Sequence, residues 1–201
     1  DSWQSSSYDM LRDLTHSPDS KWAHYVNRIV REVDPHILKT FLLNAGYEAG
    51  FRGYKTSLAM KEKYGCNIPW IILMDPTTAC NLHCTGCWAA EYGNRLNLSY
   101  EIMDKIITEG KELGIYAYLF TGGEPLVRRD DIIKLCEKHK DVAFHAFTNG
   151  TLVDEKLCED MQRVGNLSLS LNSHRSKVLR RPSEGWKLLC FCQYRRIRGK
   201  Q

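Results

Sequence analysis

A chain of 201 residues, of which 43% are hydrophobic, is long enough to bury one sizeable core and too apolar to be intrinsically disordered. No apolar run approaches the ~20 residues that span a bilayer, and the polar start does not resemble a signal peptide, so we expect a cytoplasmic protein without a membrane span. The chain begins at Asp1 rather than Met, which predicts a fragment that has lost its beginning.

The formal net charge of +4 is unevenly distributed along the chain. Residues 1–173 carry 19 Lys+Arg and 23 Asp+Glu, a net of −4, whereas residues 174–201 carry 9 Lys+Arg and one acidic residue, a net of +8. The body is therefore mildly acidic, and only the tail would attract nucleic acid or an anionic membrane surface.

Residues 1–65 are predicted to form a helical cap. Apolar residues recur at helical spacing after Ser20: Trp22, Tyr25, Val26, Ile29, Val30 and Val33. Asp34-Pro35 is typical of the N-cap and first position of a second helix, which we expect to stop at Asn44-Ala45-Gly46. A third helix is predicted over about 49–63. Its basic residues indicate a solvated face, with substrate or RNA contact as the alternative.

Residues 66–173 alternate between strand and helix patterns. Strands are predicted at 69–74, 115–120, 142–147 and 166–172, and helices at 99–113, 130–139 and 154–164. The first strand is almost continuously apolar, which is typical of a strand buried on both faces of a parallel sheet. The alternation predicts an α/β fold in which right-handed βα units curl into a barrel-like arc.

Three cysteines lie in one short loop after the first predicted strand, in a CxxxCxxC pattern: Cys80, Cys84 and Cys87. Soft thiolate ligands select zinc, copper(I) or an iron–sulfur cluster. Structural zinc sites and electron-carrier clusters usually have four protein ligands, so three cysteines indicate a metal centre with one open position. His83 lies between two of them and is not counted as a ligand. A zinc site completed by His83 or a distant residue, and cysteines without a metal, remain the alternatives.

A second motif, Thr121-Gly122-Gly123-Glu124-Pro125, ends the second predicted strand. Together, the cysteine loop and this GGEP segment, in this order and at this separation, resemble the radical SAM enzyme superfamily. The resemblance spans roughly residues 68–172. It implies a partial radical SAM barrel, with about four of the six βα units of the family, preceded by the helical cap.

The resemblance also implies the cofactors and their ligands. Cys80, Cys84 and Cys87 would hold a 4Fe-4S cluster whose fourth iron binds S-adenosylmethionine (SAM). Reductive cleavage of SAM would give a 5′-deoxyadenosyl radical. SAM contacts are carried over to Gly122, Gly123, Glu124 and Pro125, and to a polar row on the fourth strand, Ser170 and Asn172. A reductant such as flavodoxin or ferredoxin is implied, and the substrate, whether peptide, small metabolite or RNA, is left open.

The sequence departs from the family pattern in two places. The aromatic residue of the family loop precedes the third cysteine, whereas here Gly86 precedes it and Trp88 follows. The fifth-strand segment that completes the adenine site has no recognisable counterpart, because the pattern breaks down after Leu171. We expect residues 174–201 to be an irregular, non-native tail from a frameshift or truncation; a genuine basic tail that contacts RNA or a membrane is the alternative.

Two further predictions follow from the remaining cysteines and the tail. Cys66, Cys136 and Cys158 are expected to be buried free thiols, which indicates a reducing compartment. A competing functional hypothesis is a non-catalytic interaction module that binds zinc or an iron–sulfur cluster and recruits RNA through the basic tail.

Overall fold

The computed structural model describes Arg12, residues 19–84, Cys87, Ala89, Gly93, residues 96–171 and residues 190–192. The described residues do not include Trp88, Asn172 or, apart from residues 190–192, the basic tail. The predicted SAM contact of Asn172 and the predicted character of the rest of the tail therefore stay predictions.

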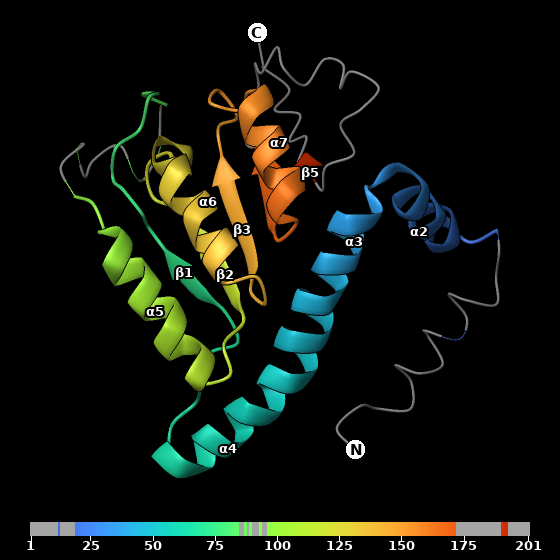
Figure 1. Ribbon diagram of the computed structural model, residues 1–201, viewed down its shortest axis with the longest axis vertical. Helices are drawn as coiled ribbons and strands as arrows, with labels where there is room; N and C mark the ends of the chain where they lie inside the picture. Colours follow the sequence, from blue (N-terminus) through green and yellow to red (C-terminus); the bar gives the residue numbers. More distant parts are fainter. Residues whose placement is uncertain are drawn as a thin grey trace, which may run out of the picture.

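A parallel sheet forms the centre of the molecule. Its strands are β1 (Ile72–Met74), β2 (Ala117–Phe120), β3 (Ala143–Thr148), β4 (Leu167–Leu171) and β5 (Cys190–Cys192), in the order β1-β2-β3-β4-β5. The helices α5 (Tyr100–Glu112), α6 (Arg129–Lys138) and α7 (Glu155–Val164) connect the first four strands and lie along one face of the sheet (Figure 1). This arrangement confirms the predicted α/β partial barrel.

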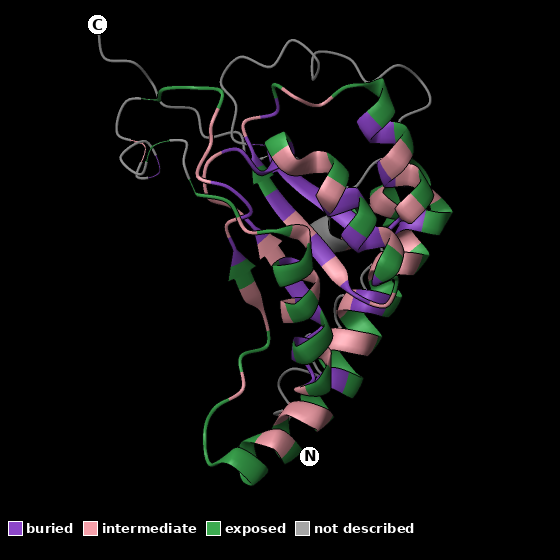
Figure 2. Cartoon of the chain, turned by 60° about the vertical axis from the view of Figure 1, so that its left-hand side comes forward, coloured by how far each residue is buried: buried purple, intermediate pink, exposed green. Residues whose placement is uncertain are grey.

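The core lies between the sheet and these helices. Tyr118, Phe120 and Phe144 are fully buried on the helix side, and the rings of Phe120 and Phe144 stack with centroids 5.6 Å apart. Figure 2 shows buried residues concentrated on the strands and on the helix faces that contact them. Ser99 caps α5, which begins where the sequence predicted a helix, because its Oγ accepts a hydrogen bond from the Ile102 backbone N–H. Ile102 itself is apolar but 49% exposed.

The opposite face of the sheet is not covered by α5, α6 or α7. Register pairs place Leu73 of β1, Leu119 of β2 and His145 of β3 side by side on this face. We call it the lumen face, since it would line the inside of a barrel. Leu73 is 58% exposed, so the prediction that the first strand is buried on both faces was wrong. β1 is an edge strand, and helices cover only one of its faces.

The N-terminal region contains α2 (Lys21–Glu32) and one continuous helical run made of α3 (Pro35–Phe41), the π-helical segment η1 (Leu42–Gly53) and α4 (Tyr54–Tyr64). Asp34 caps α3 and Pro35 follows it, as predicted. The predicted stop at residues 44–46 was wrong. The Asn44 side chain is buried and donates to the carbonyl oxygens of Lys140 and Val142, at 2.7 and 3.0 Å, so this residue anchors the helix rather than ending it.

The helical run packs at the amino-terminal ends of the strands. Asn44 binds the segment before β3, and Gly53 lies against Gly114 before β2. The predicted cap is therefore on the far end of the sheet from the loops that follow the strands. Arg52 pairs with Glu48 and lies over the Tyr116 ring, at 4.8 Å from its centroid, so this basic residue contacts the chain itself and is not merely solvated as expected.

Two other expectations are corrected. Residues 190–192, expected to be irregular, form β5 and pair in parallel with Leu169–Leu171 of β4. Cys66, which follows the end of α4, is exposed rather than buried, whereas Cys136 and Cys158 are buried and in no disulfide, as predicted. Within the described part of the chain, no helix combines the length and apolar character that a membrane crossing requires.

Candidate functional site

The sequence motifs meet at the carboxyl edge of the sheet. The cysteine loop follows β1, the Gly122-Gly123-Glu124-Pro125 segment follows β2, and the Thr148–Thr151 turn follows β3. In parallel α/β sheets, ligands bind outside the carboxyl ends of the strands. Topology therefore places segments far apart in sequence around one candidate site.

The Gly122-Gly123-Glu124 segment holds the start of the cysteine loop against the end of β2. The Gly123 N–H donates to the Thr77 carbonyl at 3.0 Å, and the Glu124 N–H donates to the Ala79 carbonyl at 2.8 Å. A Cβ on Gly123 would lie 2.2 Å from the Ala79 carbonyl oxygen, and Gly122 has a φ of +100°. Only glycine fits both positions. The close approach that these glycines make in the structure is to the chain just before Cys80.

Glu124 is almost completely buried, with 1% exposure, and its carboxylate accepts three hydrogen bonds from other residues of the protein. Its Oε1 accepts from the Leu126 N–H and the Thr148 hydroxyl, at 3.0 and 2.6 Å, and its Oε2 accepts from the Asn149 N–H at 2.7 Å. The carboxylate thus ties the end of β2 to the turn after β3. Pro125 is buried and begins the short 3₁₀ helix η3 (Pro125–Arg128).

Asn81, inside the cysteine loop, is tied to the same turn. Its Oδ1 accepts from the Asn149 side-chain amide at 2.8 Å, and its Nδ2 donates to the Thr151 hydroxyl at 2.7 Å. The Thr151 hydroxyl donates in turn to the Asn149 Oδ1 at 2.6 Å. We call Asn81, Asn149 and Thr151 the loop clamp. These contacts give the Thr148-Asn149-Gly150 turn a structural role.

The two ends of the loop are held together as well. The Leu98 N–H donates to the Pro76 carbonyl at 3.1 Å, and Arg128 donates to both of those residues' carbonyl oxygens while pairing with Asp131 at 2.6 Å. The chain before the first motif cysteine and the chain before α5 are therefore held together at Pro76 and Leu98.

None of the three cysteines forms a disulfide; Cys84 is exposed, and Cys80 and Cys87 are half-buried. Among the described residues, no three His, Cys, Asp or Glu side chains already converge as a metal-ligand group. The donor set nevertheless fits an iron–sulfur cluster, because three cysteines that form no disulfide lie in one anchored loop and soft ligands favour such a centre. His83 is exposed.

Asp75, at the end of β1, is a polar residue that sequence reasoning missed. Its Oδ1 is buried without a hydrogen-bond partner among the described residues, and burial raises the pKa of its carboxyl group. A Cβ built on Gly122 would lie 2.9 Å from the Asp75 Cβ, so the carboxylate sits beside the glycine segment. A buried carboxylate oxygen without a hydrogen bond is costly, and a cationic ligand at this edge would satisfy it.

The lumen face carries a polar cluster below this edge. The His145 Nδ1 lies 2.7 Å from the Ser168 Oγ, and its Nε2 lies 2.9 Å from the Ser170 Oγ. Ser168 and Ser170 share one face of β4, as the sequence predicted for its polar row. His145 was missed because nothing in the local sequence pairs it with β4.

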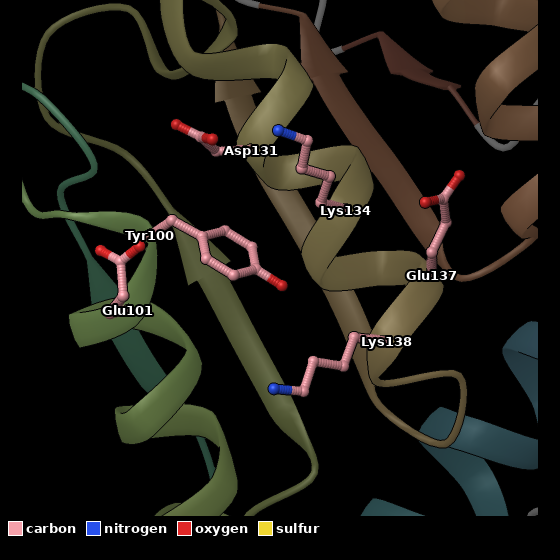
Figure 3. Close-up of a pocket in the computed structure, with 6 residues that line it drawn as sticks. All are labelled: Tyr100, Glu101, Asp131, Lys134, Glu137 and Lys138. Atoms are coloured by element: carbon pink, nitrogen blue, oxygen red, sulfur yellow. The ribbon is translucent and has the colours of Figure 1, made fainter.

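A separate groove of about 580 Å³ lies between α5 and α6 on the outer side of the molecule. Figure 3 shows its lining, with Tyr100 reaching from α5 toward α6. The other lining residues are Glu101, Asp131, Lys134, Glu137 and Lys138. It contains no cysteine and lies behind the sheet, so it is not part of the candidate site.

Comparison with known proteins now identifies the class. The family model described as the radical SAM superfamily matches residues 74–187, more than half of the chain. The chain belongs to this superfamily.

Three similar proteins each match part of this chain. GTP 3′,8-cyclase of Petrotoga mobilis is 33% identical over 136 residues, which cover 62% of this chain and 42% of the relative. Fe-coproporphyrin III synthase of Methanosarcina barkeri is 32% identical over 101 residues, covering 47% of this chain and 25% of the relative. An uncharacterised protein of Archaeoglobus fulgidus is 34% identical over 103 residues, 50% of this chain and 25% of that protein. The chain thus spans less than half the length of these relatives.

Among solved structures, Streptococcus suis SuiB bound to the precursor peptide SuiA is similar over 60% of this chain and 28% of that chain, with 21% identity and a TM-score of 0.49. SuiB bound to S-adenosylmethionine gives the same identity and TM-score.

Proposed function

We propose that this chain contains the cofactor-binding part of a radical SAM enzyme, which holds a 4Fe-4S cluster on Cys80, Cys84 and Cys87 and binds SAM at the carboxyl edge of the sheet. The observation that carries the proposal is the direct bonding of the GGEP segment to the chain before Cys80, which brings the two family motifs to one site. A bound cluster and SAM would supply reductive cleavage of SAM to a 5′-deoxyadenosyl radical, and the protein would supply positioning and exclusion of water.

The contacts to SAM are proposed residue by residue. Gly122, Gly123 and Pro125 would contribute backbone, while the Glu124 carboxylate, saturated by its own chain, would act by holding that backbone in place. Ser170 and Asn172 would contact SAM from β4. The unpaired Asp75 carboxylate is a candidate partner for the SAM ammonium group.

The substrate stays open within this proposal. The relatives are named for different reactions, a GTP cyclase and a coproporphyrin synthase, so they do not select a substrate for this chain. Peptide, small metabolite and RNA remain the candidate classes, and flavodoxin or ferredoxin the candidate reductant.

The test is anaerobic reconstitution of the full chain with iron and sulfide, followed by reduction with dithionite in the presence of SAM. We expect bound iron, acid-labile sulfide and release of 5′-deoxyadenosine. Single substitutions Cys80→Ala, Cys84→Ala and Cys87→Ala should each abolish SAM cleavage. Cys66→Ala is the matched control, since Cys66 is exposed, as Cys84 is, but lies outside the motif.

Two results would contradict the proposal. A folded chain that binds colourless zinc and no iron would support the interaction module instead. A folded chain that forms the cluster but neither binds nor cleaves SAM would contradict the proposed SAM site.

A further inference from the structure

The polar cluster on the lumen face has a hydrogen-bond direction that can be worked out from its geometry. The Ser168 hydroxyl has a single proton, which it donates to the Phe144 carbonyl at 3.3 Å. In this arrangement the same oxygen accepts from His145, which assigns the ring proton to Nδ1, 2.7 Å away. The opposite tautomer, with Ser168 donating to Nδ1, would require the hydroxyl proton to leave the Phe144 carbonyl.

The second ring nitrogen follows from the first. In a neutral imidazole with a proton on Nδ1, the Nε2 is an acceptor. The Ser170 Oγ lies 2.9 Å from Nε2, so its hydroxyl proton points at the ring. The lone pairs of Ser170 are left for another partner, and a serine held in this way can accept a hydrogen bond but has no proton to donate.

The surroundings keep the ring neutral. His145 faces Leu119 from β2, Phe147 from its own strand, with ring centroids 5.2 Å apart, and the two serines from β4. Burial lowers the pKa of His145, and no charged side chain of the described residues contributes to that shift. At neutral pH the acceptor state of Ser170 is therefore the stable one.

We propose that His145 is a positioning residue that fixes the Ser170 hydroxyl as a hydrogen-bond acceptor toward bound SAM. This inference rests on the proposed function, in which Ser170 meets SAM. It implies that Ser170 recognises a donor group of SAM, a hydroxyl or an amine, and not the SAM carboxylate, which carries no proton to give.

Protonation of His145 would reverse this direction. Once Nε2 carries a proton it donates to Ser170, and the serine hydroxyl turns its own proton toward the lumen. SAM affinity should therefore fall as pH is lowered through the pKa of His145 in the folded protein, because a donor then faces a donor. The Ser170→Ala variant should lack this pH step.

The hydrogen-bond direction is tested first, without any cofactor, by nitrogen NMR of the full chain labelled in its histidines. The His145 signals, assigned by their loss in His145→Gln, should show a protonated Nδ1 and an unprotonated Nε2 at pH 7.5. Ser168→Ala removes the acceptor of the Nδ1 proton and should shift the tautomer toward Nε2. A wild-type ring with its proton on Nε2 would overturn the proposal.

The functional consequence is tested by SAM affinity of the reconstituted, unreduced protein, measured by anaerobic calorimetry. His145→Met should weaken SAM binding by about two- to tenfold, the range of one neutral hydrogen bond, and Ser170→Ala by a similar factor. Because His145 acts through Ser170, the double variant should bind no more weakly than Ser170→Ala alone. His145→Gln, which keeps an acceptor, should recover part of the loss.

The outcomes separate this proposal from the broader one. Additive losses in the double variant, or an unchanged affinity in His145→Met, would overturn the role of His145 while leaving SAM binding in place. A reconstituted protein that binds no SAM at all would overturn both.

Discussion

At the scale of single residues, we expect the buried Glu124 carboxylate to stabilise the fold, in addition to its place in a cofactor motif. We expect Glu124→Gln to lower the free energy of unfolding by about 1–3 kcal/mol, because either orientation of the amide turns a donor toward the donors of Leu126, Thr148 or Asn149. Chemical denaturation measures this change in the free energy of unfolding. The matched control is Glu109→Gln, whose side chain is 63% exposed; a loss as large in the control would contradict the argument.

The loop clamp leads to a separate prediction about the metal centre. Asn81→Ala removes two side-chain bonds between the cysteine loop and the turn after β3. We expect the reconstituted variant to lose iron to a chelator about two- to tenfold faster than wild type, as the loop becomes less ordered. The rate of iron loss to the chelator is followed by absorbance. Asn67→Ala, an exposed asparagine outside the loop, should release iron at the wild-type rate.

At the scale of elements, the long helical run offers a paired glycine test. Gly53 is buried, and a Cβ there would lie 2.3 Å from the Gly114 carbonyl oxygen, whereas a Cβ on Gly46 meets nothing within 4 Å. Gly53→Ala should destabilise the protein by about 1–3 kcal/mol through the backbone clash. Gly46→Ala should stabilise it by about 0.5–1 kcal/mol through helix propensity. Denaturant unfolding of both variants measures the two changes in the free energy of unfolding. Changes of the same sign in both variants would contradict the observed packing.

The contact between α5 and α6 predicts a pH dependence of stability. His139 is buried at the end of α6, with its Nε2 2.9 Å from the Asp104 Oδ1 of α5. Burial lowers the pKa of His139 despite this bond. Burial raises the pKa of Asp104, but its hydrogen bonds from Lys138 and His139 lower that pKa more, so it lies below its ordinary value.

Groups with a lowered pKa in the folded state stabilise the protein above their unfolded pKa and lose that contribution as pH falls. The free energy of unfolding should therefore decrease as pH falls below about 6.5, first through His139 and, in more acid solution, through Asp104. His145 contributes in the same direction, since burial also lowers its pKa. His139→Asn should reduce the slope, and the exposed His24→Asn should not; identical slopes would exclude His139 as a source.

At the scale of the whole molecule, we expect the fold not to depend on the proposed metal site. The buried core of sheet and helices contains none of the three motif cysteines, which lie at the carboxyl edge. The triple variant Cys80→Ala, Cys84→Ala, Cys87→Ala, compared with metal-free wild type, should change the free energy of unfolding by less than about 1 kcal/mol. Cys136→Ser, which places a hydroxyl in the core, should cost about 1–3 kcal/mol. An unfolded triple variant would contradict this separation.

The sequence by itself determined the features that depend on near neighbours. The cysteine spacing, the Asp34-Pro35 helix start and the Ser99 cap each lie within a few residues, and the alternation of strands and helices defined the parallel α/β fold. Only the tertiary structure decided features that join distant segments. Asn44 anchors the helix that it was expected to end, and Glu124 and Asn81 bind the turn after β3. His145 meets its two serines only because β3 and β4 pair in this register. Such contacts depend on how strands align in space, and no local pattern in the chain encodes that alignment.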